Sequence, residues 1–367
     1  MDKNERQAMF PSSRSVIIPL VFVLILIALI IISFLGIAGV DISSWLWGHT
    51  PDYSYNRLLM DTSVNLNIYT EEGEDYANQV ADEVFSEMEN YEQKFDRGLE
   101  GSEIYKINEK AGQEPVQVSS ETMELIERSI HYGELTEGSF DITIAPVMDK
   151  WGFYQDETRL PGEDELSEII ALVDYQKIEI DEEQNEVFLP AEEMGLDLGG
   201  IAKGFVVEQG MEILEEKGID HAYLEAGGDI RVKGGKPVDE DQVEPWRIGI
   251  SDPRNGENRG LVGIVSLETS AVVTSGDYER YFMENDTRYH HIIDPSTGYP
   301  AEGVISATVF GDNTIDINAL STAIVVMGLQ EGMELIEELP ETEAVVITTE
   351  QEIYKSQGIK DKVELVQ

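Results

Sequence analysis

The chain of 367 residues carries 73 acidic and 25 basic side chains, five histidines and no cysteine. Its formal charge of -48 predicts an acidic surface suited to saline or alkaline surroundings, and it excludes nucleic acid as a partner because the phosphate backbone would be repelled. The lack of cysteine excludes disulfides, thiolate metal sites and a cysteine nucleophile, and a phosphorylated ligand would need a metal ion, a lysine or converging backbone N–H groups to bind.

Residues 16–35 are uncharged and almost wholly apolar, which is long enough to cross a hydrocarbon core of roughly 30 Å. Lys3, Arg6 and Arg14 precede this stretch, whereas Arg57 is the first basic residue after it, so the N-terminus is expected to stay cytoplasmic. A cleaved signal peptide is the alternative, but its apolar region is usually only about 7–15 residues. We therefore expect a single-pass protein of the cell membrane, with a cytoplasmic tail (1–15), a transmembrane anchor (16–38), a linker (39–56) and an extracytoplasmic domain (57–367).

The extracytoplasmic part mixes helical and strand patterns. An apolar face at helical spacing runs through 74–95 and is formed by Ala77, Val80, Ala81, Val84, Phe85, Met88, Tyr91 and Phe95. Further helices are predicted at 120–135, 163–173 and 318–328, a hairpin at 177–190, and short strands at 221–225, 246–251, 261–267, 271–274 and 304–310. Because the strands do not alternate regularly with helices, the predicted fold class is α+β rather than a doubly wound sheet.

The stretch DLGGIAKG, residues 197–204, can form an anion site. Gly199 and Gly200 permit a tight turn, and a helix starting near Ile201 carries Lys203 in its first turn. Free N–H groups at a helix start together with one ammonium can hold a phosphate even on an acidic protein. A plain strand-turn-helix connection is the alternative, and it is common for glycine pairs.

Two other glycine turns are further candidates for a ligand site. Gly227 and Gly228 end a strand in YLEAGGDIR, where hairpin glycines serve folding more often than binding. Gly138, Ser139 and Phe140 form a turn after the helix at 120–135. Aromatic residues in such runs are mostly buried, so Phe140 is expected in the core.

The stretch RYHHIIDPSTGYP places His290 next to His291. In a strand the two side chains point to opposite faces, so at most one of them lines a given site. Imidazole is well suited to take a proton near neutral pH, and the second histidine is expected to pack or to face solvent.

Polar oxygens gather at the start of the helix in DINALSTAIVVMG, residues 316–328. Asn318, Ser321 and Thr322 fall within little more than one turn, so their oxygens can meet near one point, as Mg²⁺ requires. The alternative is that Asn318 caps the helix.

Taken in order, DLGGIAKG, LEAGGDIR, SGDYERYF, HHIIDPSTGYP and NALSTAIVVMG resemble the ApbE family of FAD:protein FMN transferases, from about Met60 to Gly328. The resemblance implies an ApbE-like α+β catalytic domain with a flavin site and a magnesium site. It implies FAD contacts at Met60, Gly138, Ser139, Phe140, Asp197, Lys203 and Ile292, metal ligands at Gly200, Asn318, Thr322 and Ser321, and catalysis by His291. The chain departs from the family pattern at Asn318, where an Asp is usual, at Asp61, where a Gly is usual, and near 102–104, where the family's aromatic residue has no clear counterpart.

The implied reaction is Mg²⁺-dependent transfer of FMN from FAD to a Ser or Thr hydroxyl of a target flavoprotein, with AMP as the leaving group. His291 is the expected proton acceptor, and a metal-held carboxylate is the fallback. Two alternatives remain. Water in place of the hydroxyl would give a Mg²⁺-dependent FAD pyrophosphatase that yields FMN and AMP, and a weakened metal site at Asn318 would give a non-catalytic flavin-binding surface protein.

Overall fold

A computed structural model describes residues 52–155, 157–239, 242–254 and 260–366. The predicted span at 16–38 lies outside these ranges, and within them no helix combines the length and apolar character that crossing a membrane requires. Residues 237–239 and 242 form a small unit of their own and the other described residues form one larger unit. The larger unit contains the elements discussed below, except for the strand pair at 236–239 and 242–244, which is divided between the two units.

The helices are α3 (Glu74–Phe95), α4 (Glu103–Glu109), α5 (Ser120–Leu135), α6 (Ala145–Trp151), α7 (Glu163–Ile169), α8 (Ala202–Glu216), α9 (Thr314–Met327) and α10 (Leu329–Glu338). Single 3₁₀ turns lie at Ile142–Ile144, Ile170–Leu172 and Tyr175–Lys177. The helices predicted at 74–95 and 120–135 are confirmed to the residue. The one predicted at 163–173 is confirmed as α7 and the 3₁₀ turn that continues it.

An antiparallel sheet in the order β1-β2-β6-β7-β12-β15-β16-β17 forms the framework. Its strands are β1 (Asp52–Leu59), β2 (Thr62–Tyr69), β6 (His221–Ala226), β7 (Asp229–Lys233), β12 (Ser270–Gly276), β15 (Val304–Gly311), β16 (Glu343–Thr348) and β17 (Ile353–Lys355). Smaller sheets contain β10 (Trp246–Ser251), β11 (Leu261–Leu267) and β18 (Val363–Leu365); β13 (Tyr281–Glu284) and β14 (Thr287–His290); β3 (Val116–Gln117), β5 (Glu186–Phe188) and β4 (Glu179–Asp181); and β8 (Lys236–Asp239) and β9 (Gln242–Glu244). The predicted α+β class is confirmed.

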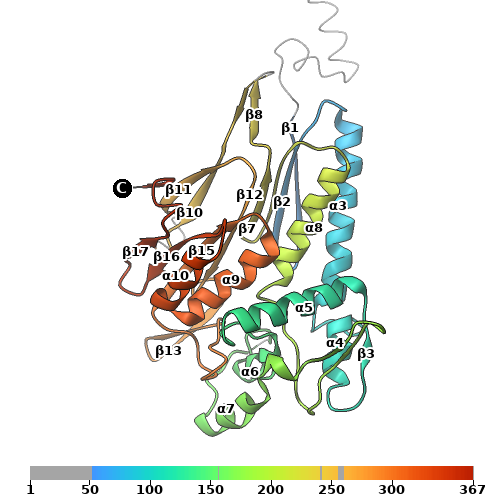
Figure 1. The fold of residues 1–367 in the computed structure, drawn as a ribbon, viewed down its shortest axis with the longest axis vertical. Helices are drawn as coiled ribbons and strands as arrows, with labels where there is room; N and C mark the ends of the chain where they lie inside the picture. The colour runs from blue at the N-terminus through green and yellow to red at the C-terminus, as the bar shows by residue number, and fades with distance from the viewer. Residues whose placement is uncertain (1–51, 156, 240–241, 255–259, 367) are drawn as a thin grey trace, which may run out of the picture. The chain divides into compact units, whose positions relative to one another are not determined.

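One face of the large sheet is covered by helices, and Figure 1 shows α3, α8 and α9 side by side on it. The apolar side chains of α3 that the sequence assigned to the core are all buried, and they pack with Val64 and Leu66 of β2. The other face packs against β10 and β11 through a separate cluster that includes Trp246 and Val272. The strands between the edge strands β1 and β17 therefore bury apolar side chains in one or both of these clusters, which fixes their register.

Strand β1 begins at Asp52 and pairs residue by residue with β2. Residues 52–56, which the sequence assigned to the linker, therefore belong to the sheet. The linker assignment fails here because β1 is an edge strand whose side chains are exposed or half-buried. Its half-buried Tyr53 and Tyr55 alternate with polar residues, but so short a run without aliphatic residues gives only a weak strand signal.

Candidate active site

A cavity of about 1540 Å³ opens between the helix layer and the segments that follow β12 and β14. This exceeds the roughly 300–1,000 Å³ usual for small-molecule sites, so a dinucleotide fits. Most of the residues that the sequence singled out line it: Met60, Ser139, Phe140, Asp197, Gly200, Lys203, His291, Ile292, Asn318 and Thr322. Gly138 and Ser321 do not line it. Gly138 lies in the turn after α5, where its N–H donates to the Gly133 carbonyl at 2.8 Å.

The start of α8 and the start of α9 meet through a glycine. The Gly204 N–H donates to Asn318 Oδ1 at 3.0 Å. A Cβ at position 204 would lie 2.5 Å from the Thr314 carbonyl oxygen and 2.8 Å from the Asn318 Cβ, so only glycine permits this approach. One turn earlier, a Cβ on Gly200 would lie 3.4 Å from Thr322 Oγ1. The 197–203 turn and the α9 start thus form one wall of the cavity.

Asn318 is free of the capping role, because α9 begins earlier than predicted. Asn313 is the N-cap, and its side chain accepts from the N–H groups of Ile315 and Asp316. Asp316 pairs with Arg128 at 2.9 Å and does not line the cavity, so it adds no ligand there.

The oxygen donors at this wall are uncharged. Asn318 Oδ1 keeps one lone pair beyond its bond to Gly204, and Thr322 Oγ1 lies 3.2 Å from Ser275 Oγ. Ser321 is fully buried behind them, where its hydroxyl donates to the Asn318 carbonyl at 2.9 Å and lies 2.8 Å from Ser275 Oγ. Within the described ranges no group of three or more His, Cys, Asp or Glu residues could hold a metal. Hard neutral oxygens suit Mg²⁺ when phosphate oxygens complete the shell, so the donor set fits that ion together with an anionic ligand.

Lys203 points its ammonium into the cavity. Its Nζ lies 3.5 Å from Asp229 Oδ1 and 3.5 Å from the Gly227 carbonyl. Burial disfavours its charge, but Asp229 and Glu279 outweigh this effect and raise the pKa of Lys203. Burial also raises the pKa of Asp229, although Lys203 opposes the shift. The ammonium is therefore held charged, with room on its cavity side for an anion.

Glu279 faces the same corner and sequence reasoning assigned it no role. Its side chain opens into the cavity, but the walls desolvate it and raise its pKa to about 7, with Asp229 adding to the shift and Lys203 and Arg280 opposing it. A carboxyl poised near neutral pH is typical of sites that handle protons. The stretch SGDYERYF was quoted as a motif, but nothing in it distinguished Glu279 from the many acidic residues of the chain.

Asp197 orders the glycine turn that leads into α8. Its Oδ1 accepts from the Gly199 N–H at 2.8 Å, and its Oδ2 lies 3.1 Å from Arg97 Nε. The guanidinium groups of Arg97 and Arg280 each lie 5.1 Å from the centroid of the Tyr154 ring. These three residues line the cavity and come from distant segments, so no local sequence pattern could have joined them. Arg97 and Arg280 bring positive charge to a cavity in an otherwise acidic protein.

An aromatic ring does lie near the 102–104 segment. Tyr105 follows that segment directly and lines the cavity, although the sequence motif offered no clear counterpart. The Ser102 hydroxyl caps α4 by accepting from the Tyr105 N–H at 2.9 Å, which places the tyrosine in the first turn of the helix.

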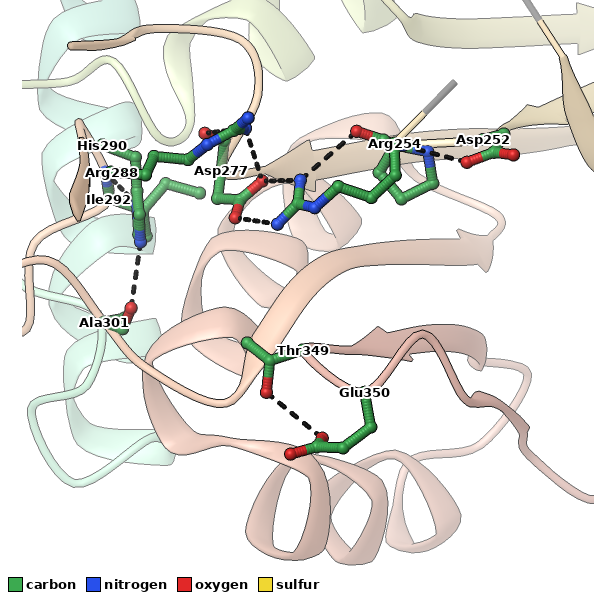
Figure 2. Close-up of polar contacts among 10 residues, drawn as sticks. Asp252, Arg254, Asp277, Arg288, His290, Ile292, Ala301, Thr349 and Glu350 are labelled. Atoms are coloured by element: carbon green, nitrogen blue, oxygen red, sulfur yellow. Dashed lines mark hydrogen bonds and ion pairs between the residues drawn. The ribbon is translucent and has the colours of Figure 1, made fainter. Parts of the chain in front are cut away.

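The two adjacent histidines have different environments. His290 is buried, with Nε2 at 2.9 Å from the Ala301 carbonyl and Nδ1 accepting from the Ile292 N–H at 3.3 Å, as Figure 2 shows. Nε2 must therefore carry the proton, and His290 serves packing. His291 lines the cavity, and its Nδ1 has no hydrogen-bond partner among the described residues. Burial, helped by His290 and Arg280, lowers the pKa of His291 to about 3, so its imidazole is neutral and is a weak proton acceptor in the free protein.

Comparison with known proteins gives one consistent result. Residues 60–346 match the model of the ApbE family. The chain is 31% identical over 326 residues to the FAD:protein FMN transferase of Treponema pallidum, covering 86% of this chain and 90% of that protein. The crystal structure of the ApbE protein from Thermotoga maritima is similar with a TM-score of 0.78 at 32% identity, covering 85% of this chain and 99% of that one. The flavin transferase ApbE from Vibrio cholerae has a TM-score of 0.75 at 29% identity, with the same coverage of 85% and 99%.

Proposed function

The chain belongs to the ApbE family, and on that premise we propose that it is an FAD:protein FMN transferase. In this reaction a Ser or Thr hydroxyl of an acceptor flavoprotein attacks the phosphorus on the FMN side of the FAD diphosphate. The new O–P bond forms as the bond to the AMP phosphate breaks, so AMP leaves with the bonding electron pair and FMN remains on the acceptor as a phosphoester. The observation that carries this proposal is the cavity wall where Lys203 and the start of α8 face the start of α9.

The diphosphate is assigned to the corner beside Lys203. There the half-buried ammonium of Lys203 and the positive end of the α8 dipole provide the local positive potential that the acidic surface lacks. Asp197 fixes the turn through Gly199. By the family resemblance, Met60, Ser139, Phe140 and Ile292 contact the remainder of FAD, and Gly138 supports the turn that carries Ser139 and Phe140.

Mg²⁺ would be held by the Gly200 carbonyl and the side chains of Asn318 and Thr322 together with phosphate oxygens, while Ser321 supports this set from behind. When bound, the ion supplies positive charge to the diphosphate as charge builds on its oxygens. Because no carboxylate belongs to this set, affinity for the metal depends strongly on the FAD diphosphate itself.

His291 is our candidate to take the proton from the acceptor hydroxyl. Its low pKa in the free protein arises from burial and from the nearby positive charges of Arg280 and Lys203. A bound diphosphate neutralises those charges and therefore raises the pKa of the imidazole toward a value at which it accepts a proton well.

This function is tested by measuring flavin that becomes covalently bound to the acceptor protein. The enzyme domain is incubated with FAD, Mg²⁺ and an acceptor flavoprotein domain, and in-gel flavin fluorescence after denaturation is compared with AMP release. We expect one flavin bound covalently to the acceptor for each AMP molecule released. Free FMN in place of bound flavin would instead establish an FAD pyrophosphatase, and tight FAD binding without AMP at any Mg²⁺ concentration would establish a flavin-binding protein without catalysis.

We further propose that residues 16–38 anchor the protein in the cell membrane, with the catalytic domain extracytoplasmic and its acceptor a protein at that membrane. The apolar stretch at 16–35 and the basic residues that precede it support this arrangement. Protease added to intact cells should digest the catalytic domain, and digestion only after lysis would contradict the proposed orientation.

A further inference from the structure

Three sheets of the structure are tied together at one carboxylate. Asp277 directly follows β12 of the large sheet, and its side chain is only 9% exposed. Its two oxygens accept from both terminal nitrogens of Arg254, which follows β10, at 2.7 and 2.6 Å. Arg288 of β14 approaches the same carboxylate at 3.4 Å. Figure 2 shows Asp277 between the two guanidinium groups. We call this group of three side chains the Asp277 clamp.

The clamp lies directly before the segment that enters the active-site cavity. Tyr278, Glu279 and Arg280 follow Asp277 in the chain, and all three line the cavity. The carbonyl of Arg280 accepts from the His291 N–H at 3.0 Å. A rotation of the chain at Asp277 would therefore move Glu279, Arg280 and the candidate base His291 together.

The backbone of this region has its own supports, so the clamp is not needed to form the strands. The Asp277 N–H donates to the Ile305 carbonyl at 2.9 Å, β12 pairs with β15, and β13 pairs with β14. These bonds do not by themselves fix the direction in which residues 278–280 continue from the end of β12. A carboxylate gripped by a planar guanidinium fork fixes direction as well as distance.

Arg254 is itself held in place. Its backbone N–H donates to Asp252 Oδ1 at 2.9 Å, and the Asp252 N–H donates to the Gly260 carbonyl at 2.9 Å. The hydrogen bond to Asp277 is the main cause that raises the pKa of Arg254, so the guanidinium stays charged across the whole range in which the enzyme would work. The clamp thus joins the turn after β10 to the cavity segment that follows β12 of another sheet.

We propose that Arg254 is a positioning residue for flavin transfer: through Asp277 it orients residues 278–280 and His291 toward the acceptor hydroxyl without touching FAD. This inference rests on the proposed function. It predicts that loss of the clamp lowers the rate of the chemical step and leaves FAD binding intact, because the Lys203–Asp229 pair and the contact between Gly204 and Asn318 are made by residues outside the clamp and outside 278–280.

The test compares Arg254→Gln and Arg254→Lys with wild type, with Arg247→Gln as the matched control. Arg247 lies on β10, and its pair with Glu364 is exposed and 3.7 Å long, so the control removes an arginine from the strand that leads to Arg254 without touching the clamp. The measurements are kcat and KM for AMP release and for acceptor labelling, the Kd of FAD from flavin fluorescence, and the melting temperature.

We expect kcat of Arg254→Gln to fall ~100-fold, the scale of a 1 Å misplacement of reacting groups, with the Kd of FAD unchanged. Lysine keeps the charge but cannot grip both oxygens, so Arg254→Lys should recover only part of the rate, and Arg247→Gln should match wild type. An unchanged kcat in Arg254→Gln would overturn the inference. A parallel loss of rate, FAD binding and melting temperature that lysine does not relieve would also overturn it, since that pattern indicates a purely structural role.

The outcome for wild type separates this inference from the proposed function. If wild type releases AMP but labels no acceptor, the transfer proposal fails, and the same variants then test the clamp on hydrolysis. If wild type releases no AMP at all, both proposals fail.

Discussion

Replacing Gly204 by alanine probes the contact on which the site depends. The new Cβ would lie 2.5 Å from the Thr314 carbonyl oxygen and 2.8 Å from the Asn318 Cβ. Both neighbours are fixed parts of α9, so the two helices must move apart. Movement would also stretch the hydrogen bond from the Gly204 N–H to Asn318 Oδ1.

The expected size of the effect follows from three contributions. Overpacking costs ~1–3 kcal/mol, and the weakened hydrogen bond costs about 0.5–1.5 kcal/mol. Alanine stabilises a helix interior over glycine by ~1 kcal/mol, which offsets part of this. The free energy of unfolding should therefore fall by roughly 1–3 kcal/mol, and the melting temperature should fall by ~2–4 °C for each kcal/mol lost.

Thermal unfolding and FAD titration of the purified domain measure both consequences. Gly210→Ala on the same helix is the control, because its Cβ would meet the Leu224 Cδ2 at 2.7 Å, the end of a flexible side chain that can turn away. We expect Gly204→Ala to melt lower than Gly210→Ala and to bind FAD more weakly. If Gly204→Ala were as stable as wild type and bound FAD equally well, the contact between α8 and α9 would not close the site as described.

Three further outcomes follow from the site. The pKa of Glu279 is raised to about 7, so its stabilising contribution is full below the ordinary value of 4.5 and is lost as pH rises through 7. The melting temperature of Glu279→Gln relative to wild type should therefore rise between pH 5 and pH 8. A difference in melting temperature that stays constant over this range would contradict this. Asn318→Asp adds a charge to the metal site and should lower the Mg²⁺ concentration for half-maximal transfer by several-fold, whereas an unchanged or higher requirement would show that Asn318 does not ligate. His291→Ala should lower the transfer rate ~10²–10⁴-fold with FAD binding intact, while His290→Ala should mainly lower the melting temperature; equal rates for His291→Ala and wild type would refute the base assignment.

The fold was predictable where burial leaves a periodic trace. Helix α3 buries one continuous apolar face, so its bounds and its core side chains could be read from spacing alone. Strand β1 has no buried face, so its residues looked like a linker. The position of Asn313, and not Asn318, as the cap of α9 depends on where the helix starts, and helix ends leave only a weak trace in sequence.

Only the parts of the site that lie in short sequence motifs could be predicted from the sequence. The turn at 197–203 and the start of α9 could each be proposed from local chemistry, and the family resemblance joined them. Arg97 and Tyr154 could not be found in this way, because each lies in an unremarkable local stretch. Glu279 lies in the motif SGDYERYF but could not be told apart from the other acidic residues. All three gain their role from neighbours brought close by the fold. The pKa of Glu279 in particular is raised by burial and is adjusted by the charges of Lys203 and Asp229, which come from other elements.

A crystal structure with FAD and Mn²⁺ tests the central claim most directly, because anomalous scattering locates the metal without ambiguity. The account predicts the diphosphate beside Lys203, with the ion between the Gly200 carbonyl and the side chains of Asn318 and Thr322. A diphosphate bound elsewhere in the cavity, or a metal ion with no ligand from the start of α9, would contradict it.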